Sequence, residues 1–269
     1  MDRAAVRHRL AVLRGDAITT WSARKEPAYR RLARTYRLPE ETKRVYCHHI
    51  RKTAGTSLHF SFLGLDGEDP DLVQRRLDTS ALHRTISGRY AFVAHQHRLL
   101  EQGHYFYGWS HLPAHRISLP PRTFTVTILR DPVERIVSLY SYLREGDEAG
   151  MAFPAPFAER SMAQSGFSAF LEKLPKKELL RQVFMFSRTF SVAEATDQIA
   201  RCSCVLFTEH YESGLAALAE RLNLPLVPRR ARATHVRASL SNAELEQLRQ
   251  VLEPEYELIR QLEVSQPGR

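Results

Sequence analysis

Short apolar runs alternate with segments of helical periodicity along the chain. Four runs are rich in β-branched and aromatic residues, which is typical of buried strands. These runs cover residues 45–50, 90–95, 123–129 and 203–207. Apolar residues at helical spacing follow the first and third runs, beginning at Leu58 and Val133. Pro132 suits the first turn of the second of these helices, and Asp131 suits the cap before it.

The second half of the chain is predicted to be mainly helical. Helices are expected at residues 166–174, 177–186, 191–201, 211–222 and 241–263. Residues 145–165 are richer in Gly, Pro, Ala and Ser, which indicates a surface insertion. Strands that alternate with helices favour an α/β fold, in which helices cover both faces of a parallel sheet. Ligands of such folds bind beyond the carboxyl ends of the strands, where Lys52, His95 and Arg130 are predicted to lie.

Composition excludes several classes of protein. With 43% hydrophobic and 9% aromatic residues, the 269-residue chain has enough apolar side chains to fill a core, so it is not mainly disordered. No apolar run approaches the roughly 20 residues of a membrane-spanning helix. Arginines interrupt every apolar stretch near the N-terminus, which therefore lacks the apolar block of a secretory signal. The three cysteines, Cys47, Cys202 and Cys204, form no disulfide or zinc pattern, and we expect a cytoplasmic protein.

The net charge of +9 is concentrated at the N-terminus. Residues 1–44 hold 12 basic and 5 acidic side chains, whereas residues 45–269 hold 27 and 25. Val6, Leu10 and Leu13 recur at helical spacing, as do Leu32 and Tyr36. We therefore expect residues 1–44 to be a basic helical extension packed on a main domain of residues 45–269. The extension is either a solvated helical face or a contact for a membrane surface or an anionic polymer, and we expect no nucleic-acid partner.

The segment after the first predicted strand reads RKTAGTS, residues 51–57. A turn of small residues that leads from a strand into a helix exposes main-chain N–H groups, which form an anion site together with the helix N-terminus. Lys52 adds a positive charge to this turn. The segment is not a Walker A loop, because that pattern needs two glycines with Lys directly after the second, whereas Lys52 precedes Gly55. The residues alone leave two alternatives, a phosphate site or a plain capped turn.

The second candidate motif reads RDPVERIVSLY, residues 130–140. Arg130 ends a buried strand, where its guanidinium can bind an oxyanion with two hydrogen bonds. Ser138 lies two helical turns further on and can present its hydroxyl to the same group. The alternative is an ion pair of Arg130 with Asp131 or Glu134.

In order and separation, the two motifs resemble the nucleotide-binding elements of sulfotransferases that use PAPS, 3′-phosphoadenosine 5′-phosphosulfate. The segments HHIRKTAGTSL and TILRDPVERIVSLYSYL are most similar to the carbohydrate sulfotransferases of family 2, which include heparan sulfate 2-O-sulfotransferase and its bacterial relatives. The resemblance covers residues 45–145 well. It implies a sulfotransferase fold, with a P-loop-like central parallel sheet flanked by helices.

The resemblance also implies roles for individual residues. Lys52 would contact the transferring sulfuryl group and the leaving phosphate. Four residues would cradle the 5′-phosphate: Thr53, Gly55, Thr56 and Ser57. Arg130 and Ser138 would hold the 3′-phosphate. Arg51 stands where relatives usually have Pro, and either loosens the loop or adds an anion contact.

A catalytic histidine is the third implied element, because relatives place one after the second strand. His95 occupies that position, and a histidine can take the proton of an attacking hydroxyl because its pKa lies near neutrality. His97 and His104 are the alternatives. His48 and His49 lie inside the first predicted strand and are interpreted as structural.

A late basic loop, residues 229–237, fits the segment that covers the nucleotide in many enzymes that use PAPS, and Arg232 is its candidate nucleotide contact. The alternatives are a solvated loop or a contact for an anionic acceptor. Glu209 either orients a loop or contacts substrate. We therefore expect an enzyme that transfers the sulfuryl group of PAPS to a hydroxyl of an acceptor, expected to be a carbohydrate, without a metal. The alternatives are a kinase that uses ATP and magnesium, and a non-catalytic binder of anionic polymer.

Overall fold

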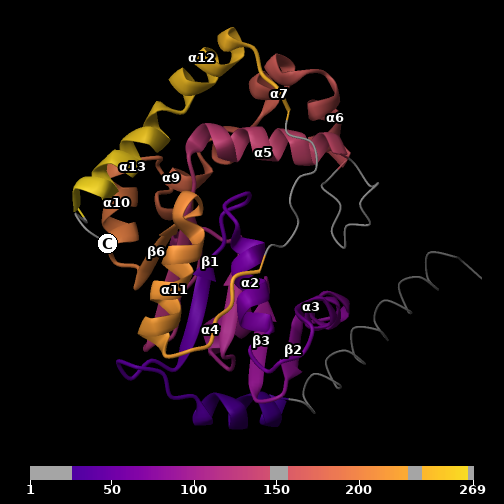
Figure 1. Cartoon of the computed structure of the whole chain (residues 1–269), viewed down its shortest axis with the longest axis vertical. Helices are drawn as coiled ribbons and strands as arrows, with labels where there is room; N and C mark the ends of the chain where they lie inside the picture. Colours follow the sequence, from indigo (N-terminus) through magenta and orange to yellow (C-terminus); the bar gives the residue numbers. More distant parts are fainter. Residues whose placement is uncertain (1–25, 146–156, 230–237, 266–269) are drawn as a thin grey trace, which may run out of the picture.

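The computed structural model describes residues 26–145, 157–229 and 238–265 (Figure 1). Its centre is a six-stranded sheet in the order β2-β3-β4-β1-β5-β6. The strands are β1 (Arg44–His48), β2 (Arg84–Ser87), β3 (Tyr90–Ala94), β4 (Tyr107–Ser110), β5 (Thr123–Leu129) and β6 (Cys204–Phe207). Within this sheet β2 and β3 pair antiparallel, and the remaining neighbours pair parallel. The predicted α/β fold and its four predicted strands are confirmed.

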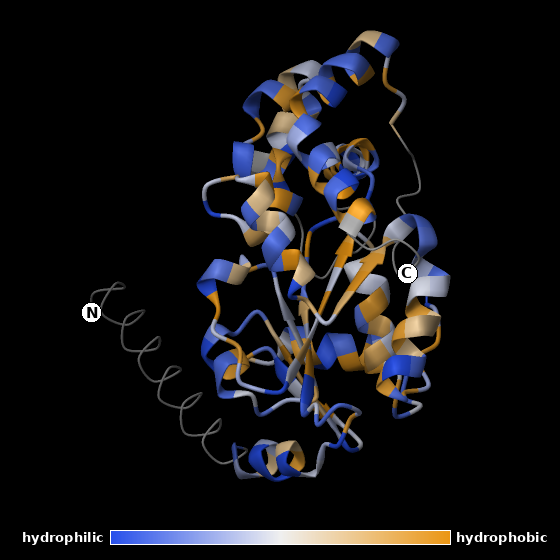
Figure 2. Ribbon diagram, turned by 90° about the vertical axis from the view of Figure 1, so that its left-hand side faces the viewer, coloured by the Kyte–Doolittle hydropathy of each residue, from blue (hydrophilic) through white to orange (hydrophobic). Residues whose placement is uncertain are grey.

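Helices cover both faces of the sheet and extend beyond one of its edges. After a helix over residues 26–35, they are α2 (Gly55–Leu63), α3 (Pro70–Thr79), α4 (His97–Gln102), η1 (Ala114–Arg116), α5 (Pro132–Glu145), α6 (Phe157–Gln164), α7 (Phe167–Lys173), α8 (Lys176–Leu179), α9 (Arg181–Phe186), α10 (Val192–Ala200), η3 (Thr208–His210), α11 (Tyr211–Leu222), α12 (Asn242–Val251) and α13 (Glu253–Ser265). Figure 2 shows hydrophilic and hydrophobic residues mixed along these helices, as expected for helices with one packed side.

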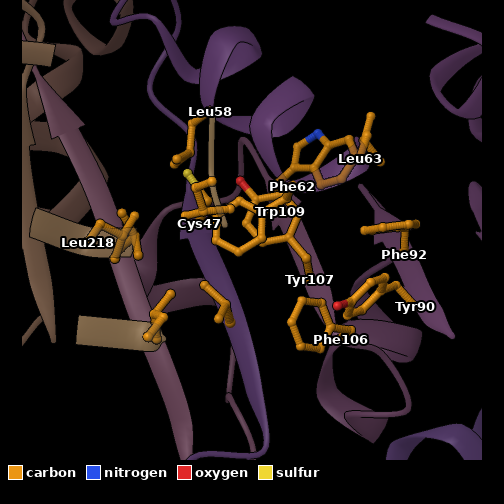
Figure 3. Close-up of a cluster of buried hydrophobic side chains, with 14 of the residues drawn as sticks. Cys47, Leu58, Phe62, Leu63, Tyr90, Phe92, Phe106, Tyr107, Trp109 and Leu218 are labelled. Carbon is orange, nitrogen blue, oxygen red and sulfur yellow. The ribbon is translucent and has the colours of Figure 1, made fainter. Parts of the chain in front are cut away.

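The alternation of side chains along β1 explains the two covered faces. Val45 and Cys47 belong to the apolar cluster that β1 forms with α2, α3 and α11. Tyr46 points to the opposite face and packs with Leu100 of α4, because successive strand residues alternate between faces. Figure 3 shows part of the first cluster, where Cys47 lies close to Leu58 and Trp109. By the same alternation, His49 faces α2.

A separate apolar cluster joins α5, α6, α7 and α12. Figure 1 places these helices at one end of the molecule, beyond the sheet. The carboxyl ends of five parallel strands meet at the edge beneath them, where His48 pairs with both Ser110 and Thr127, and Leu129 pairs with Phe207. The residues that follow these strands therefore lie together at the carboxyl end of the sheet, which is called the sheet edge below.

Several predicted boundaries differ from the observed ones. The helix predicted at 177–186 is two short helices that meet at Leu180, and the one predicted at 241–263 is α12 and α13, which meet at Leu252. Residues 157–164, which fall in the expected surface insertion, form α6. The strands β2 and β4 were not predicted. β4 contains Gly108, where a Cβ would lie 2.7 Å from the side chain of Leu100.

The N-terminal segment is described from residue 26 onward. The helix over 26–35 contains Leu32, which packs against the main core together with Tyr36 just beyond the helix. The spacing of Leu32 and Tyr36 therefore predicted a helix correctly, whereas Val6, Leu10 and Leu13 lie outside the described residues. The division of the chain at residue 44 stays a prediction. Among the described helices, none has the length and apolar character needed to cross a membrane.

Candidate active site

The loop between β1 and α2 is the first part of the candidate site. Lys52 and Ala54 have left-handed backbone conformations, with φ of 69° and 63°. Such conformations are costly for residues other than glycine and cluster at functional sites. Ala54 is the N-cap of α2 and provides no side-chain hydrogen bond to the helix. The N–H of Ser57 donates a hydrogen bond of 3.0 Å to the carbonyl of Ala54, so the main-chain N–H groups of Gly55 and Thr56 at the start of α2 are the ones suited to bind an anion.

Thr53 has a different position from the neighbouring loop residues. It is buried, and its hydroxyl donates a hydrogen bond of 3.0 Å to the carbonyl of Ile50. That hydroxyl therefore holds the loop together, and the group that Thr53 can offer to an anion is its main-chain N–H.

Gly55 is required because the ring of His49 occupies the space of a side chain. A Cβ on Gly55 would lie 2.2 Å from Cδ2 and 2.3 Å from Nε2 of His49. A hydrogen bond of 3.0 Å joins Nδ1 of His49 to Nε2 of His59, and Nδ1 of His59 lies 2.7 Å from the hydroxyl of Tyr107. Burial holds the pKa of both histidines well below the usual value. His49 is thus a neutral support beneath the loop, in agreement with its predicted structural role.

Arg130 connects this loop to the second motif. It follows β5, and its Nη1 donates a hydrogen bond of 3.1 Å to the carbonyl of Lys52. Its Nη2 lies 3.6 Å from a carboxylate oxygen of Glu134 on α5. The predicted convergence of the Lys52 loop and Arg130 is therefore observed.

Three residues of α5 form a row on the side that faces this junction. Glu134 contacts Arg130, and the ring of Tyr142 lies 4.3 Å from Nζ of Lys52. Ser138 lies midway between them, because residues four apart occupy the same face of a helix. It is half-buried. Two cations and one hydroxyl therefore surround the same part of the sheet edge, an arrangement suited to an anion with more than one phosphate.

His95 lies at the same edge, directly after β3. Its φ of 59° is left-handed, and its N–H donates a hydrogen bond of 2.9 Å to the carbonyl of Trp109. The residue is exposed, yet the protein around the ring lowers its pKa to about 4, chiefly by desolvation and further through the nearby His83. The imidazole is therefore unprotonated at neutral pH, as a general base must be.

The two alternative histidines occupy less suitable positions. His97, in the first turn of α4, pairs with Glu101 of the same helix at 2.9 Å. His104 precedes β4, at the opposite edge of the sheet, and pairs with Glu26 at 2.8 Å. Both side chains bind carboxylates, and His104 is remote from Lys52 and Arg130.

His111 was not predicted as a site residue, although it lies beside His95. The two rings stack with centroids 5.4 Å apart, and the ring of His111 lies 4.3 Å from that of His49 on its other side. Nδ1 of His111 donates a hydrogen bond of 2.8 Å to the carbonyl of His49. Because a carbonyl only accepts, Nε2 of His111 carries a lone pair. Desolvation, followed by the effect of His95, lowers the pKa of His111 to about 3.

Arg51 and Glu209 stabilise the surroundings of the loop. Nη1 of Arg51 lies 3.7 Å from Glu178 of α8, so the charge that replaces the usual Pro is paired within the protein. Glu209 accepts a hydrogen bond of 2.8 Å from the N–H of Asp131, which orients the turn after Arg130.

Arg232 lies outside the described residues, but the chain on both sides of it is anchored near the site. The hydroxyl of Ser61 on α2 donates a hydrogen bond of 2.8 Å to the carbonyl of Val227. The N–H of Ala238 donates one of 2.9 Å to the hydroxyl of Ser141 on α5. The two helices that carry the candidate motifs therefore hold the two ends of the basic segment. The role of Arg232 stays a prediction.

Within the three described ranges, no group of three histidine, cysteine, aspartate or glutamate side chains is arranged to hold a metal ion. The geometry thus presents an anion site, built by a strand-to-helix loop and by an arginine and a serine of the next motif, beside a neutral histidine.

Comparison with protein families agrees with this geometry. The sequence model of the sulfotransferase family matches residues 34–259. The chain therefore belongs to the sulfotransferase family, whose members are enzymes that transfer sulfate. No curated protein matches the chain significantly.

Proposed function

We propose that this enzyme transfers the sulfuryl group of PAPS to a hydroxyl of a carbohydrate or glycoconjugate. The observation that carries the proposal is the hydrogen bond from Arg130 to the carbonyl of Lys52, which joins the two motifs. PAPS bears a phosphosulfate at its 5′ position and a phosphate at its 3′ position. The loop of residues 52–57 suits the first group, and Arg130 with Ser138 suits the second. The carbohydrate acceptor rests on the resemblance of residues 45–145 to family 2.

Lys52 is the residue that we propose stabilises the transition state. During transfer, the acceptor oxygen forms a bond to sulfur while the bond from sulfur to the 5′-phosphate oxygen breaks. The electron pair of the broken bond stays on the departing phosphate, where negative charge accumulates. An ammonium and main-chain N–H groups aimed at that oxygen stabilise it more in the transition state than in the ground state. Nζ of Lys52 lies 4.3 Å from the centre of the Tyr142 ring on α5.

His95 is the proposed base. As the acceptor hydroxyl attacks, its proton passes to the neutral imidazole, which becomes an imidazolium. His111 limits the orientations of the His95 ring by stacking on it, and is itself fixed by its hydrogen bond to His49. A bound PAPS would raise the pKa of His95 towards neutrality, because an anion favours the charged imidazolium.

The direct test is a transfer assay with PAPS labelled in its sulfate group and a panel of hydroxyl-bearing saccharides. We expect label in a saccharide and equal formation of 3′,5′-adenosine bisphosphate. The matched control replaces PAPS by ATP with magnesium, and we expect no phosphorylated saccharide. Phosphoryl transfer from ATP, together with no consumption of PAPS on any acceptor, would contradict the proposal and favour a kinase.

A further inference from the structure

The main chain of Arg130 is held by a buried glutamine from a distant part of the sequence. The N–H of Arg130 donates to Oε1 of Gln182 at 2.9 Å, and Nε2 of Gln182 donates to the carbonyl of Arg130 at 3.0 Å. Gln182, on α9, has no exposed surface. Its two bonds satisfy both polar groups of Arg130, so they fix the point from which the guanidinium extends.

Glu255 in turn fixes the orientation of Gln182. The main-chain N–H of Gln182 donates to Oε1 of Glu255 at 2.7 Å, and its Nε2 donates to Oε2 at 3.0 Å. A carboxylate only accepts, so Nε2 must face Glu255, and Oε1 is left to receive the N–H of Arg130. The charge of Glu255 is paired with Arg135 of α5 at 3.2 Å, and both side chains are fully buried.

The next residue of α13 holds the next residue of the turn. The hydroxyl of Tyr256 donates to Oδ2 of Asp131 at 3.2 Å. Oδ1 of Asp131 accepts the N–H of Glu134 at 2.8 Å, which caps α5. Two successive residues of α13 therefore hold the two residues that follow β5, Tyr256 directly and Glu255 through Gln182, from about 125 positions away in the sequence.

Stability alone does not account for this network. Removing two charges from water is costly, and well-packed apolar residues often replace a buried ion pair without loss of stability. A network that forms hydrogen bonds to both the main-chain N–H and the carbonyl of one residue is instead suited to fixing the position of that residue. Arg130 is also the residue on which the proposed selection of a 3′-phosphate depends.

We propose that Gln182, oriented by Glu255, is a positioning residue that, together with Tyr256, sets Arg130 for binding a 3′-phosphate. This inference rests on the proposed function. It makes the first turn of α13 part of the nucleotide-recognition apparatus, because Glu255 orients the glutamine that holds the main chain of Arg130.

The test compares two nucleotides that differ by the 3′-phosphate. Dissociation constants of the full chain for 3′,5′-adenosine bisphosphate and for 5′-AMP are measured by calorimetry. Gln182→Met preserves the length of the side chain and removes both bonds to Arg130. We expect the preference for the bisphosphate to fall by about 3- to 10-fold, as for the loss of one net hydrogen bond, with 5′-AMP affinity unchanged. An unchanged preference would overturn the proposal.

Thr208→Val is the matched control. The hydroxyl of Thr208 donates to the carbonyl of Leu129 at 3.1 Å, beside Arg130 but not on it. We expect this variant to keep the full preference for the bisphosphate. An equal loss in both variants would mean that any disturbance at the end of β5 lowers the preference, and would overturn the assignment to Gln182.

A double-mutant cycle separates positioning from general support of the fold. In the Arg130→Ala background, Gln182→Met should cause no further loss of preference, because its effect passes through Arg130. A further loss of the same size would overturn the inference. If Arg130→Ala alone left the preference unchanged, the 3′-phosphate assignment in the proposed function would fail, and the role of Gln182 with it.

If Gln182→Met does not fold, Tyr256→Phe replaces it, with an expected loss of about 2- to 5-fold in the preference for the bisphosphate. An unchanged preference would again contradict the proposal.

Discussion

The guanidinium of Arg130 donates a hydrogen bond of 3.1 Å to the main-chain carbonyl of Lys52, across 78 positions of sequence. The arginine that ends β5 thereby closes one side of the loop that follows β1. The bond uses one of the five N–H groups of the guanidinium, and Nη2 of the same group lies 3.6 Å from a carboxylate oxygen of Glu134. A ligand that binds the loop and Arg130 at once is held by two strands that are neighbours in the sheet.

Lys52→Ala should lower turnover far more than it weakens binding of 3′,5′-adenosine bisphosphate. The ammonium acts on charge that develops in the transition state, and loss of such a donor costs on the order of 100- to 1000-fold in turnover. Lys173→Ala, at an exposed lysine of α7, is the control and should be fully active. Near-normal turnover of Lys52→Ala at saturating PAPS would show that the lysine has another role.

His95→Ala should abolish sulfate transfer while nucleotide binding stays intact. Loss of a general base usually costs about 100- to 10,000-fold. His97→Ala is the matched control, because His97 lies two residues further on and binds Glu101, and it should retain most activity. An inactive His97→Ala together with an active His95→Ala would show that the base is His97 rather than His95.

The pH profile provides a second check on His95. In the free enzyme its pKa is about 4, and the neutral form is the active one. The value of kcat/KM for PAPS, which reports the enzyme before PAPS binds, should therefore be level above this pKa and fall as the pH drops through about 4. A fall centred at pH 6 to 7 in kcat/KM for PAPS that persists in the residual activity of His95→Ala would assign the ionisation to another group.

Gly55→Ala should prevent nucleotide binding, because the new methyl group overlaps the ring of His49. Overpacking of this kind costs about 1–3 kcal/mol and displaces either the loop or the ring. Gly67→Ala is a useful control: its Cβ meets open space, but its φ of 81° strains any side chain. The control should lose stability and keep nucleotide binding. Normal binding by Gly55→Ala would show that His49 can move without consequence.

The buried His48 should make the unfolding free energy of the protein depend on pH. Burial lowers its folded-state pKa to about 4, whereas the unfolded value is about 6.5. Between these values the unfolded chain binds one more proton, so the stabilising contribution is complete above pH 6.5 and is lost as the pH falls towards 4. The slope is about 1.4 kcal/mol per pH unit for one such histidine.

His48→Phe tests this linkage, because His48 packs against the rings of Tyr46 and Phe186 and its Nδ1 is a buried polar atom that makes no hydrogen bond. Urea unfolding of this variant between pH 6.5 and 5 should show a shallower dependence of the unfolding free energy on pH than the wild type. An identical slope in the two proteins would mean that the pKa of His48 is the same in the folded and the unfolded chain.

The sequence predicted the parts of the fold that have strong local signals. The first and third apolar runs became β1 and β5, and Pro132 begins α5 as expected. Arg84-Thr85-Ile86-Ser87 has too few apolar residues to signal a strand, and Tyr107-Gly108-Trp109-Ser110 is short and contains a glycine. Pairing with neighbours, rather than local propensity, makes β2 and β4 strands.

The same distinction between local signals and distant contacts applies to the candidate site. Lys52, His95 and Arg130 follow recognisable strands, so their shared place at one end of the sheet was predicted, whereas their roles came from the resemblance to family 2. His111 was missed because β4 was missed. Gln182 and Glu255 were missed because their partners lie about 50 to 120 positions away, and no local pattern carries such contacts.

The most direct test of the central claim is thermal unfolding of the full chain with 3′,5′-adenosine bisphosphate, 5′-AMP or ATP with magnesium. At 100 times its dissociation constant, a ligand adds about 2.7 kcal/mol, or roughly 5 to 10 °C in Tm for a protein of this size. We expect a shift of this order with the bisphosphate, and a much smaller one with 5′-AMP at the same concentration. Equal shifts with the bisphosphate and 5′-AMP, or a shift with ATP and magnesium alone, would contradict the assignment of Arg130 and Ser138 to a 3′-phosphate.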